Sequence, residues 1–286
     1  MNDRPVQQSH GASAAAIQSH YDLSNDFYRL WLDPSLTYSC ALWYGNEDLS
    51  AAQMNKIDWH LDRAEIKKGD HLLDVGCGWG ALLERAVKVR GAASAVGLTF
   101  SKAQADHVKS AGNPAIEARL ESWAVHTPKH QYDGIVSVGA FEHFAGIDES
   151  EEAKLQNYRK FFQFCHRSLK SGGCLSLQSI TYENAERAEF TDLYRRIFPE
   201  SDLPRLEDIV RSVHRLFEIV ELRNDREHYA RTLRIWLNNL RQRRAEAVAI
   251  VGEEAVAAYD EYLKVSAVGF RFGTTNLARL KLRRLA

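Results

Sequence analysis

Apolar and polar positions alternate along this chain in the order typical of an α/β protein. Short apolar runs of strand length occur at residues 71–75, 94–98, 115–118, 132–138, 174–180 and 217–223. Stretches with apolar residues at helical spacing lie before and between them, at residues 50–67, 80–89, 101–110 and 154–169, and a long helical stretch is expected at 229–265. The alternation predicts a doubly wound, mostly parallel sheet with helices on its faces. Residues 280–286 read as either a last strand or a basic tail.

Segments of different character flank this predicted core. Residues 1–65 include an aromatic-dense stretch and are expected to form a cap over the sheet. Residues 182–215 are heavily charged and interrupt the alternation, so we expect an insertion over the carboxyl edge of the sheet. Residues 66–181 and 216–286 then make up a Rossmann-like core, and the whole chain of 286 residues suits one domain.

Composition narrows the classes of function. Hydrophobic residues make up 45% of the chain, enough for a large core, and a net charge of −1 gives no reason to expect nucleic acid as a partner. The four cysteines show no Cys-x-x-Cys pair and no zinc spacing, so we expect no metal and a reducing compartment. The N-terminus lacks a signal-peptide pattern and no apolar run reaches the ~18 residues of a membrane span, which favours the cytoplasm.

The segment Leu72–Gly80 carries the strongest functional signal. Its apolar run ends in a Gly-x-Gly-x-Gly turn, and the residues that follow have helical spacing. Such a strand–turn–helix brings backbone close to a nucleotide-like ligand at the carboxyl end of a sheet. We expect Gly76 and Gly78 to allow that approach, and Asp74 precedes them by two positions. A plain tight turn is the alternative, which the acid and the later motifs disfavour.

Candidates for further cofactor contacts follow the next two predicted strands. Thr99 stands where many nucleotide-binding sheets place a ribose-binding acid, and Gln104 lies one turn into the following helix. Thr99 is alternatively a helix N-cap, although Ser101 suits that role better. Trp123 follows the third strand, where an aromatic ring can lie against adenine, and a buried core position fits it nearly as well.

Three segments combine polar and aromatic residues outside the glycine turn. Glu142 leaves the fourth predicted strand beside His143, and a carboxylate at a strand's carboxyl end favours chemistry over a helix-dipole role. We expect only one of the two to face the pocket, with His143 structural. Cys40 lacks the partners of a nucleophile, so a small buried residue is the better interpretation. The third segment is His228–Leu233.

These motifs together resemble the cyclopropane fatty acid synthase family, and most nearly the mycolic acid cyclopropane synthases, over about residues 17 to 275. The resemblance rests on Ser19–Ser24, Leu36–Cys40, Leu72–Gly80, Gly97–Thr99, Gly139–Phe144 and His228–Leu233. It implies the seven-stranded class I methyltransferase fold and transfer of a methyl group from S-adenosylmethionine to an alkene carbon. It also implies a hydrophobic or lipid substrate, for which an acyl chain is the leading expectation and a cyclopropane one conceivable product.

The resemblance also implies roles for individual residues. The positions that match cofactor contacts are Tyr21, Tyr38, Ser39, Gly76, Gly78, Thr99, Gln104 and Trp123. The positions that match the family's site for bicarbonate, its general base, are Cys40, Glu142, Ile180 and Tyr229. Two features depart from the pattern: Gln178 stands where the family has a histidine, and the insertion at about 182–204 is shorter and charged. Because Gln178 cannot take a proton, we expect bicarbonate binding to be weak or absent.

Other acceptors and partners stay open at this stage. A prenyl diphosphate, an aromatic carbon or an amine of a small metabolite would use the same fold, and a non-catalytic cofactor-binding module is the least favoured class. Six basic residues suit either transient contact with an anionic membrane surface or a solvated helix face and tail. They are Arg241, Arg243, Arg244, Lys281, Arg283 and Arg284.

Overall fold

The computed structural model describes residues 24–184 and 202–286, and a seven-stranded sheet forms its centre. The strands are β1 (His71–Val75), β2 (Ser94–Thr99), β3 (Ile116–Leu120), β4 (Tyr132–Val138), β5 (Leu169–Thr181), β6 (Phe217–Asn224) and β7 (Asn276–Arg284). Their order is β3-β2-β1-β4-β5-β7-β6, and β7 alone runs antiparallel to its neighbours β5 and β6 in this sheet. The predicted doubly wound, seven-stranded fold is confirmed, and the basic tail proves to be strand β7.

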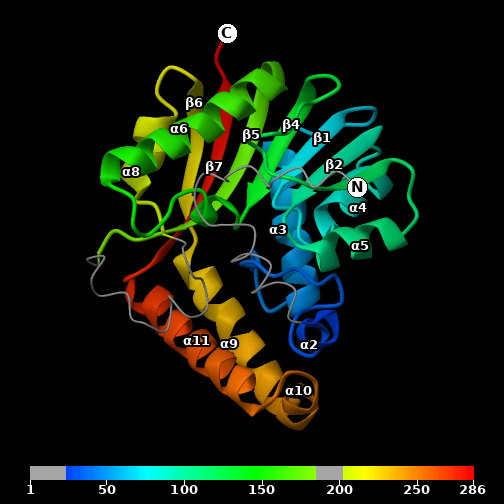
Figure 1. Cartoon of the computed structure of the whole chain (residues 1–286), viewed down its shortest axis with the longest axis vertical. Coiled ribbons are helices and arrows are strands. Elements are labelled where there is room, and N and C mark those ends of the chain that lie inside the picture. Colours follow the sequence, from blue (N-terminus) through cyan, green and yellow to red (C-terminus); the bar gives the residue numbers. More distant parts are fainter. Residues whose placement is uncertain (1–23, 185–201) are drawn as a thin grey trace, which may run out of the picture.

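Helices cover both faces of the sheet and extend past its lower end (Figure 1). They are α2 (Asn25–Arg29), α3 (Leu49–Arg63), α4 (Ala81–Lys88), α5 (Lys102–Ser110), α6 (Glu151–Ser168), α8 (Leu206–Ser212), α9 (Arg226–Gln242), α10 (Arg244–Val251) and α11 (Glu253–Phe272), with the 3₁₀ turn η1 (Phe141–His143). Two predicted boundaries were wrong. The helix expected at 50–67 ends at Arg63, and the stretch expected at 229–265 divides into three helices, broken at Gly252 between the last two.

The glycine turn after β1 has the backbone that its sequence requires. Gly76, Gly78 and Gly80 have φ angles of 86°, 53° and 87°, a region that residues with a Cβ avoid. A Cβ on Gly76 would lie 2.5 Å from the Cβ of Ala140, so the turn packs directly against the loop after β4. The carboxyl ends of β1 and β4 are thereby held together at one edge.

That carboxyl edge is covered by α2 and by the three helices α9 to α11 (Figure 1). Aromatic side chains from both regions form one apolar cluster, in which Trp31 lies 5.7 Å from Trp236 and Phe27 lies 5.1 Å from Tyr259 between ring centroids. The sequence had assigned the cover to residues 1–65 and to an insertion at 182–215. Residues 185–201 of that insertion lie outside the described residues, so its place over this edge stays a prediction. Its described helix α8 packs against α6, with Ile209 buried in the core.

Candidate active site

A cavity opens at the carboxyl ends of β1, β2 and β4. Eight of the predicted cofactor residues line it, namely Tyr38, Ser39, Asp74, Gly76, Gly78, Thr99, Gln104 and Trp123. They come from the segment before α3, from β1 and its glycine turn, from the end of β2 and the start of α5, and from the loop after β3. Tyr21 lies outside the described residues. The fold therefore gathers these side chains from four separate places, and their contacts with a cofactor stay a prediction.

Asp74 supplies a buried acid to this cavity. Its side chain is 3% exposed, and Oδ1 has no hydrogen-bond partner among the described residues. Burial raises the pKa of Asp74 to about 7, against an opposing effect of Lys56. A Cβ added to Gly78 would meet no atom within 4 Å, so open space lies above that backbone. An unpaired acid beside an open, glycine-lined space fits a cofactor that carries an ammonium group.

Thr99 and Gln104 form a bonded pair on the cavity wall. The Thr99 hydroxyl donates to Gln104 Oε1 at 2.7 Å, and the Ser101 side chain caps α5 by accepting the Gln104 backbone N–H at 3.1 Å. Ser101 is thus the N-cap, as the sequence favoured. Trp123 is 6% exposed and packs against Phe144 at 5.5 Å between ring centroids, so it combines a core position with a place on the wall.

Glu142 and His143 point in different directions from η1. His143 lines the cavity, and burial lowers its pKa to about 4, so its imidazole is neutral at physiological pH. Glu142 turns toward β5, where its Oε1 accepts the Ile180 backbone N–H at 2.7 Å. Its other oxygen, Oε2, is buried with no hydrogen-bond partner among the described residues. Burial raises the pKa of Glu142 to about 7, and the Ile180 hydrogen bond and the nearby Ser179 hydroxyl oppose that shift.

The residues that match the predicted bicarbonate site, together with Gln178, are not among the residues that line the cavity in the described chain. Cys40 and Tyr229 share one apolar cluster, against which Ile180 packs. Burial raises the pKa of the Cys40 thiol to about 11, which excludes a thiolate at neutral pH and supports its interpretation as a small buried residue. Cys40 and Glu142 directly adjoin two residues on the wall, Ser39 and His143.

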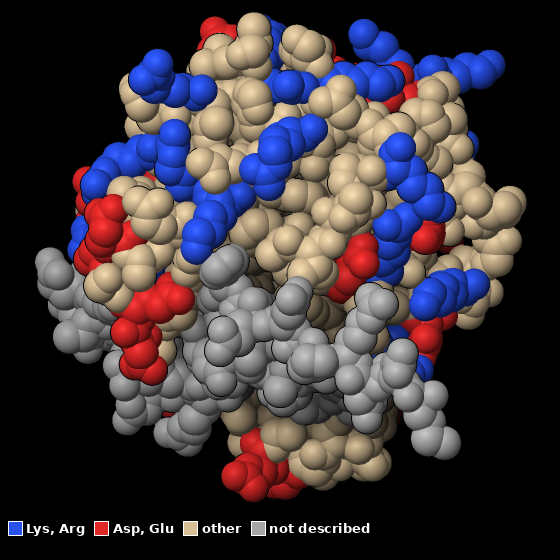
Figure 2. All heavy atoms as spheres, turned by 45° about the horizontal axis from the view of Figure 1, so that its top comes forward, with Lys and Arg blue, Asp and Glu red and all other residues tan. Residues whose placement is uncertain are grey.

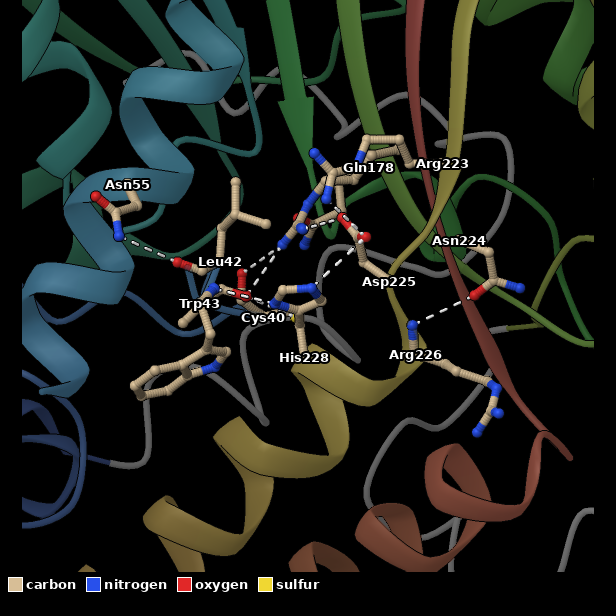
Figure 3. Close-up of polar contacts among 12 residues, drawn as sticks. Cys40, Leu42, Trp43, Asn55, Gln178, Arg223, Asn224, Asp225, Arg226 and His228 are labelled. Atoms are coloured by element: carbon tan, nitrogen blue, oxygen red, sulfur yellow. Dashed lines mark hydrogen bonds and ion pairs between the residues drawn. The ribbon is translucent and has the colours of Figure 1, made fainter. Parts of the chain in front are cut away.

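Arg279 joins this region into one buried network. Its Nε donates to Gln178 Oε1 at 2.8 Å, its Nη2 donates to the carbonyls of Cys40 and Ala41 at 3.1 and 3.2 Å, and its Nη1 pairs with Asp225. Figure 3 shows Gln178, Asp225 and Cys40 converging from three separate segments. Because a guanidinium only donates, Gln178 must turn its oxygen toward Arg279. This residue, fully buried in β7, was missed because its sequence context indicates a basic tail.

A polar stripe on α3 was also missed. Gln53, Lys56 and His60 are buried on the side of the helix that faces the segment before it and β5. Gln53 Nε2 donates to the carbonyls of Thr37 and Ser39 at 3.1 and 2.9 Å, and Lys56 Nζ donates to Ser39 Oγ at 2.8 Å. Their spacing of three and four residues is the one signal in the sequence, but it also describes a solvated helix face.

His60 completes the network beneath Gln178. Its Nδ1 lies 2.8 Å from Ser176 Oγ, and its Nε2 lies 3.4 Å from Gln178 Oε1. Because that oxygen only accepts, the Nε2 of His60 carries the proton. Burial, Arg279 and Lys56 hold the pKa of His60 well below its usual value. His60 is therefore a neutral donor and does not replace the family's histidine as a base.

The strand–glycine–helix turn, the unpaired Asp74 and the cavity at the switch point of the sheet define a nucleotide-type ligand site of the kind found in class I methyltransferases. A family model described as mycolic acid cyclopropane synthetase matches residues 8–280. The chain belongs to this family and is a methyltransferase that uses S-adenosylmethionine.

Curated relatives agree along nearly the full length. Cyclopropane mycolic acid synthase 3 of Mycobacterium tuberculosis (strain CDC 1551 / Oshkosh) is 35% identical, over 93% of this chain and 96% of the relative. Cyclopropane mycolic acid synthase MmaA2 of Mycobacterium tuberculosis (strain ATCC 25177 / H37Ra) is 36% identical, with the same coverage. The sequence-based family assignment is thereby confirmed.

Solved structures show the same architecture. Mycolic acid cyclopropane synthase CmaA1 complexed with SAH and CTAB superposes with a TM-score of 0.87 at 34% identity, covering 96% of this chain and 99% of that one. Cyclopropane synthase MmaA2 from Mycobacterium tuberculosis gives 0.88 at 34% identity, with 97% and 100% covered. The [4+2]-cyclase SpnF gives 0.76 at 15% identity, which extends the likeness of the fold alone to a different chemistry.

The basic residues considered for membrane contact all have partners. Arg241, Arg243 and Arg244 pair with Asp260, Glu246 and Glu253. Lys281 and Arg283 pair with Glu65 and Glu218, and Arg284 donates to the Leu169 carbonyl. Figure 2 shows Lys and Arg side chains spread over one face, with acids beside several of them. These pairs weaken the case for a membrane-binding patch, and no helix within the described ranges is long and apolar enough to span a membrane.

Proposed function

We propose that this methyltransferase acts on an alkene carbon of a hydrophobic, acyl-lipid-like substrate and yields a methyl-branched product. The observation that carries the proposal is the buried Glu142, which directly precedes the cavity-lining His143 and whose Oε2 has no hydrogen-bond partner among the described residues. An alkene is a weak nucleophile, and its methylation leaves a carbocation that must lose a proton. A buried carboxylate with a pKa of about 7 suits that last step. The full-length likeness to cyclopropane mycolic acid synthases supports the substrate class.

Different residues would serve different steps of this methyl transfer. When bound, S-adenosylmethionine supplies an electrophilic methyl group on a positively charged sulfur. The glycine turn and Asp74 would hold the cofactor and so orient its methyl group toward the acceptor. The covering helices exclude water, so that the carbocation is not quenched. Aromatic rings that line the cavity, among them those of Tyr38 and Phe144, can stabilise positive charge.

Gln178 affects which of two products the reaction forms. Its oxygen accepts from Arg279 and His60, so it offers only amide N–H groups to any further partner and cannot take a proton. An anionic base such as bicarbonate would then lack an imidazole partner at this position, so deprotonation falls to Glu142. Loss of a proton from the transferred methyl group closes a cyclopropane, whereas loss from a neighbouring carbon leaves an alkene with a methyl branch. We favour the second outcome.

A substrate panel with isotope-labelled S-adenosylmethionine tests the proposal. The acceptors are lipids with one cis double bond, their saturated counterparts as matched controls, a prenyl diphosphate and a small amine. We expect label only in the unsaturated lipids, read by mass spectrometry. Label in the amine or the prenyl diphosphate, with none in the lipids, would contradict the proposal and show that the acceptor belongs to the alternative class.

A further inference from the structure

Lys56 places a buried ammonium group on the wall of the cofactor cavity. The residue is 3% exposed, and its Nζ donates to the hydroxyl of Ser39 at 2.8 Å. Both residues line the cavity, as does Asp74. A lysine is costly to bury unless an anion or several acceptors compensate it, and a single neutral hydroxyl is a weak compensation.

The charges around Lys56 come from several elements. Arg279 of β7 opposes its protonation, whereas Asp33, Cys40 and Asp74 favour it. Burial has the largest effect and lowers the pKa of Lys56 to about 7. The amino group is therefore only partly protonated near neutral pH, and an anion bound beside it would raise its pKa and keep it charged.

The cavity therefore presents two opposite partners side by side: an ammonium with a hydroxyl, and a carboxylate with an unpaired oxygen. S-adenosylmethionine ends in an amino acid, which carries one carboxylate and one ammonium group. We propose that Lys56, together with Ser39, binds the carboxylate of the cofactor's amino-acid end while Asp74 faces its ammonium group. This assignment concerns the cofactor alone and does not depend on the identity of the methyl acceptor.

A different role would be mechanical. Lys56 and Gln53 both bond the segment before α3, so Lys56 could act only by holding Ser39 in place. The two roles predict different ligand dependence. If Lys56 only holds Ser39 in place, its substitution should weaken every ligand that binds in the cavity. If it binds the carboxylate, its substitution should weaken only ligands that carry the carboxylate.

Calorimetry with two ligands separates these roles. The ligands are S-adenosylhomocysteine and its decarboxylated analogue, which keeps the amine and the adenosine. The variants are Lys56→Met, which keeps the length without the charge, and Lys154→Met as the matched control. Lys154 is equally buried, at 3% exposed, but pairs with Glu151 and Asp202 on the α6 side and does not line the cavity.

We expect Lys56→Met to weaken S-adenosylhomocysteine by about 10- to 100-fold, the usual value of a hydrogen bond to a charged group. The decarboxylated analogue should bind Lys56→Met within about threefold of wild type, which also shows that the variant is folded. The Lys154→Met control should leave both affinities unchanged. Equal losses for the two ligands, or no loss for either, would overturn the assignment. Ser39→Ala should also weaken S-adenosylhomocysteine more than the decarboxylated analogue, by a smaller factor. If Ser39→Ala weakened both ligands equally, Ser39 would not belong to the carboxylate site.

Discussion

The carboxylate of Glu142 accepts the backbone N–H of Ile180 at 2.7 Å and so ties η1 to β5 beside the cofactor cavity. This contact fixes Oε1, while Oε2 stays buried without a partner among the described residues. Because burial raises the pKa of Glu142 to about 7, the group is divided between its charged and neutral forms near neutrality. A carboxyl group in this state can accept a proton at modest cost.

Glu142→Gln should reduce methyl transfer by about 10²- to 10⁴-fold, the range for acid–base groups. The amide keeps the shape and still accepts the Ile180 N–H, but it cannot take a proton. Affinity for S-adenosylhomocysteine should change little, because Glu142 does not line the cavity. Glu221→Gln, which alters an acid of β6 paired with Arg63, is the control. Turnover within about twofold of wild type would reduce Glu142 to a structural role.

The same variant should change how stability depends on pH. An acid whose pKa is raised on folding binds more protons in the folded state, so the free energy of unfolding falls as pH rises from its unfolded to its folded pKa. For Glu142 this window runs from about pH 4.3 to about pH 7. Between about pH 4 and pH 8, Glu142→Gln should therefore lose roughly 3 kcal/mol less of that free energy than wild type does. Denaturant unfolding at the two pH values measures it, and parallel losses would contradict the raised pKa.

Gly78→Val should abolish cofactor binding because the new side chain obstructs the ligand, and the same substitution at a glycine outside the cavity serves as the control for backbone strain. Gly78 has a φ of 53° and open space where a Cβ would project, on the cavity wall. Gly112 has a φ of 66° and equally open space, but it follows α5 outside the cavity. Both substitutions strain the backbone, and only the first obstructs the ligand. Calorimetry should show loss of S-adenosylhomocysteine binding in Gly78→Val and near wild-type affinity in Gly112→Val. Equal effects would mean that strain explains both.

Cofactor binding should move protons in a manner that depends on Lys56 and Asp74. Both have a pKa near 7 in the free protein. A bound carboxylate raises the pKa of Lys56, which takes up a proton, whereas a bound ammonium lowers that of Asp74, which releases one. At pH 7 the two effects nearly cancel in wild type. Calorimetry in buffers of different ionisation enthalpy should show net release in Lys56→Met and net uptake in Asp74→Asn. The same sign in both variants would contradict the paired assignment.

The sequence predicted the sheet and the cofactor wall because both depend on local pattern. Apolar runs of strand length and the turn from Asp74 to Gly80 are each contained within about ten residues, and the family motifs preserve them. The contribution of helices α9 to α11 to the cover was not predicted, because they reach the carboxyl edge through packing against α2. No periodicity within either segment specifies that contact.

The buried polar network could not be predicted from the sequence for a related reason. Arg279 and Asp225 are 54 residues apart, and Arg279 and Cys40 are 239 apart, so neither pairing has a local signature. Arg279 sits among other basic residues of β7 that are partly exposed, and only the tertiary structure distinguishes it from them. Lys56 was overlooked because a lysine on an amphipathic helix is nearly always solvated.

The most direct test of alkene methylation uses S-adenosylmethionine with a fully deuterated methyl group and a lipid with one cis double bond. High-resolution mass spectrometry of the product counts the deuterium atoms that remain, in buffer with and without bicarbonate. We predict that all three deuterium atoms are retained, with no dependence on bicarbonate, because the proton leaves from a neighbouring carbon. Retention of only two, together with strong bicarbonate dependence, would show ring closure from the transferred methyl group and contradict the role assigned to Gln178. Absence of deuterium from the lipid would contradict alkene methylation itself.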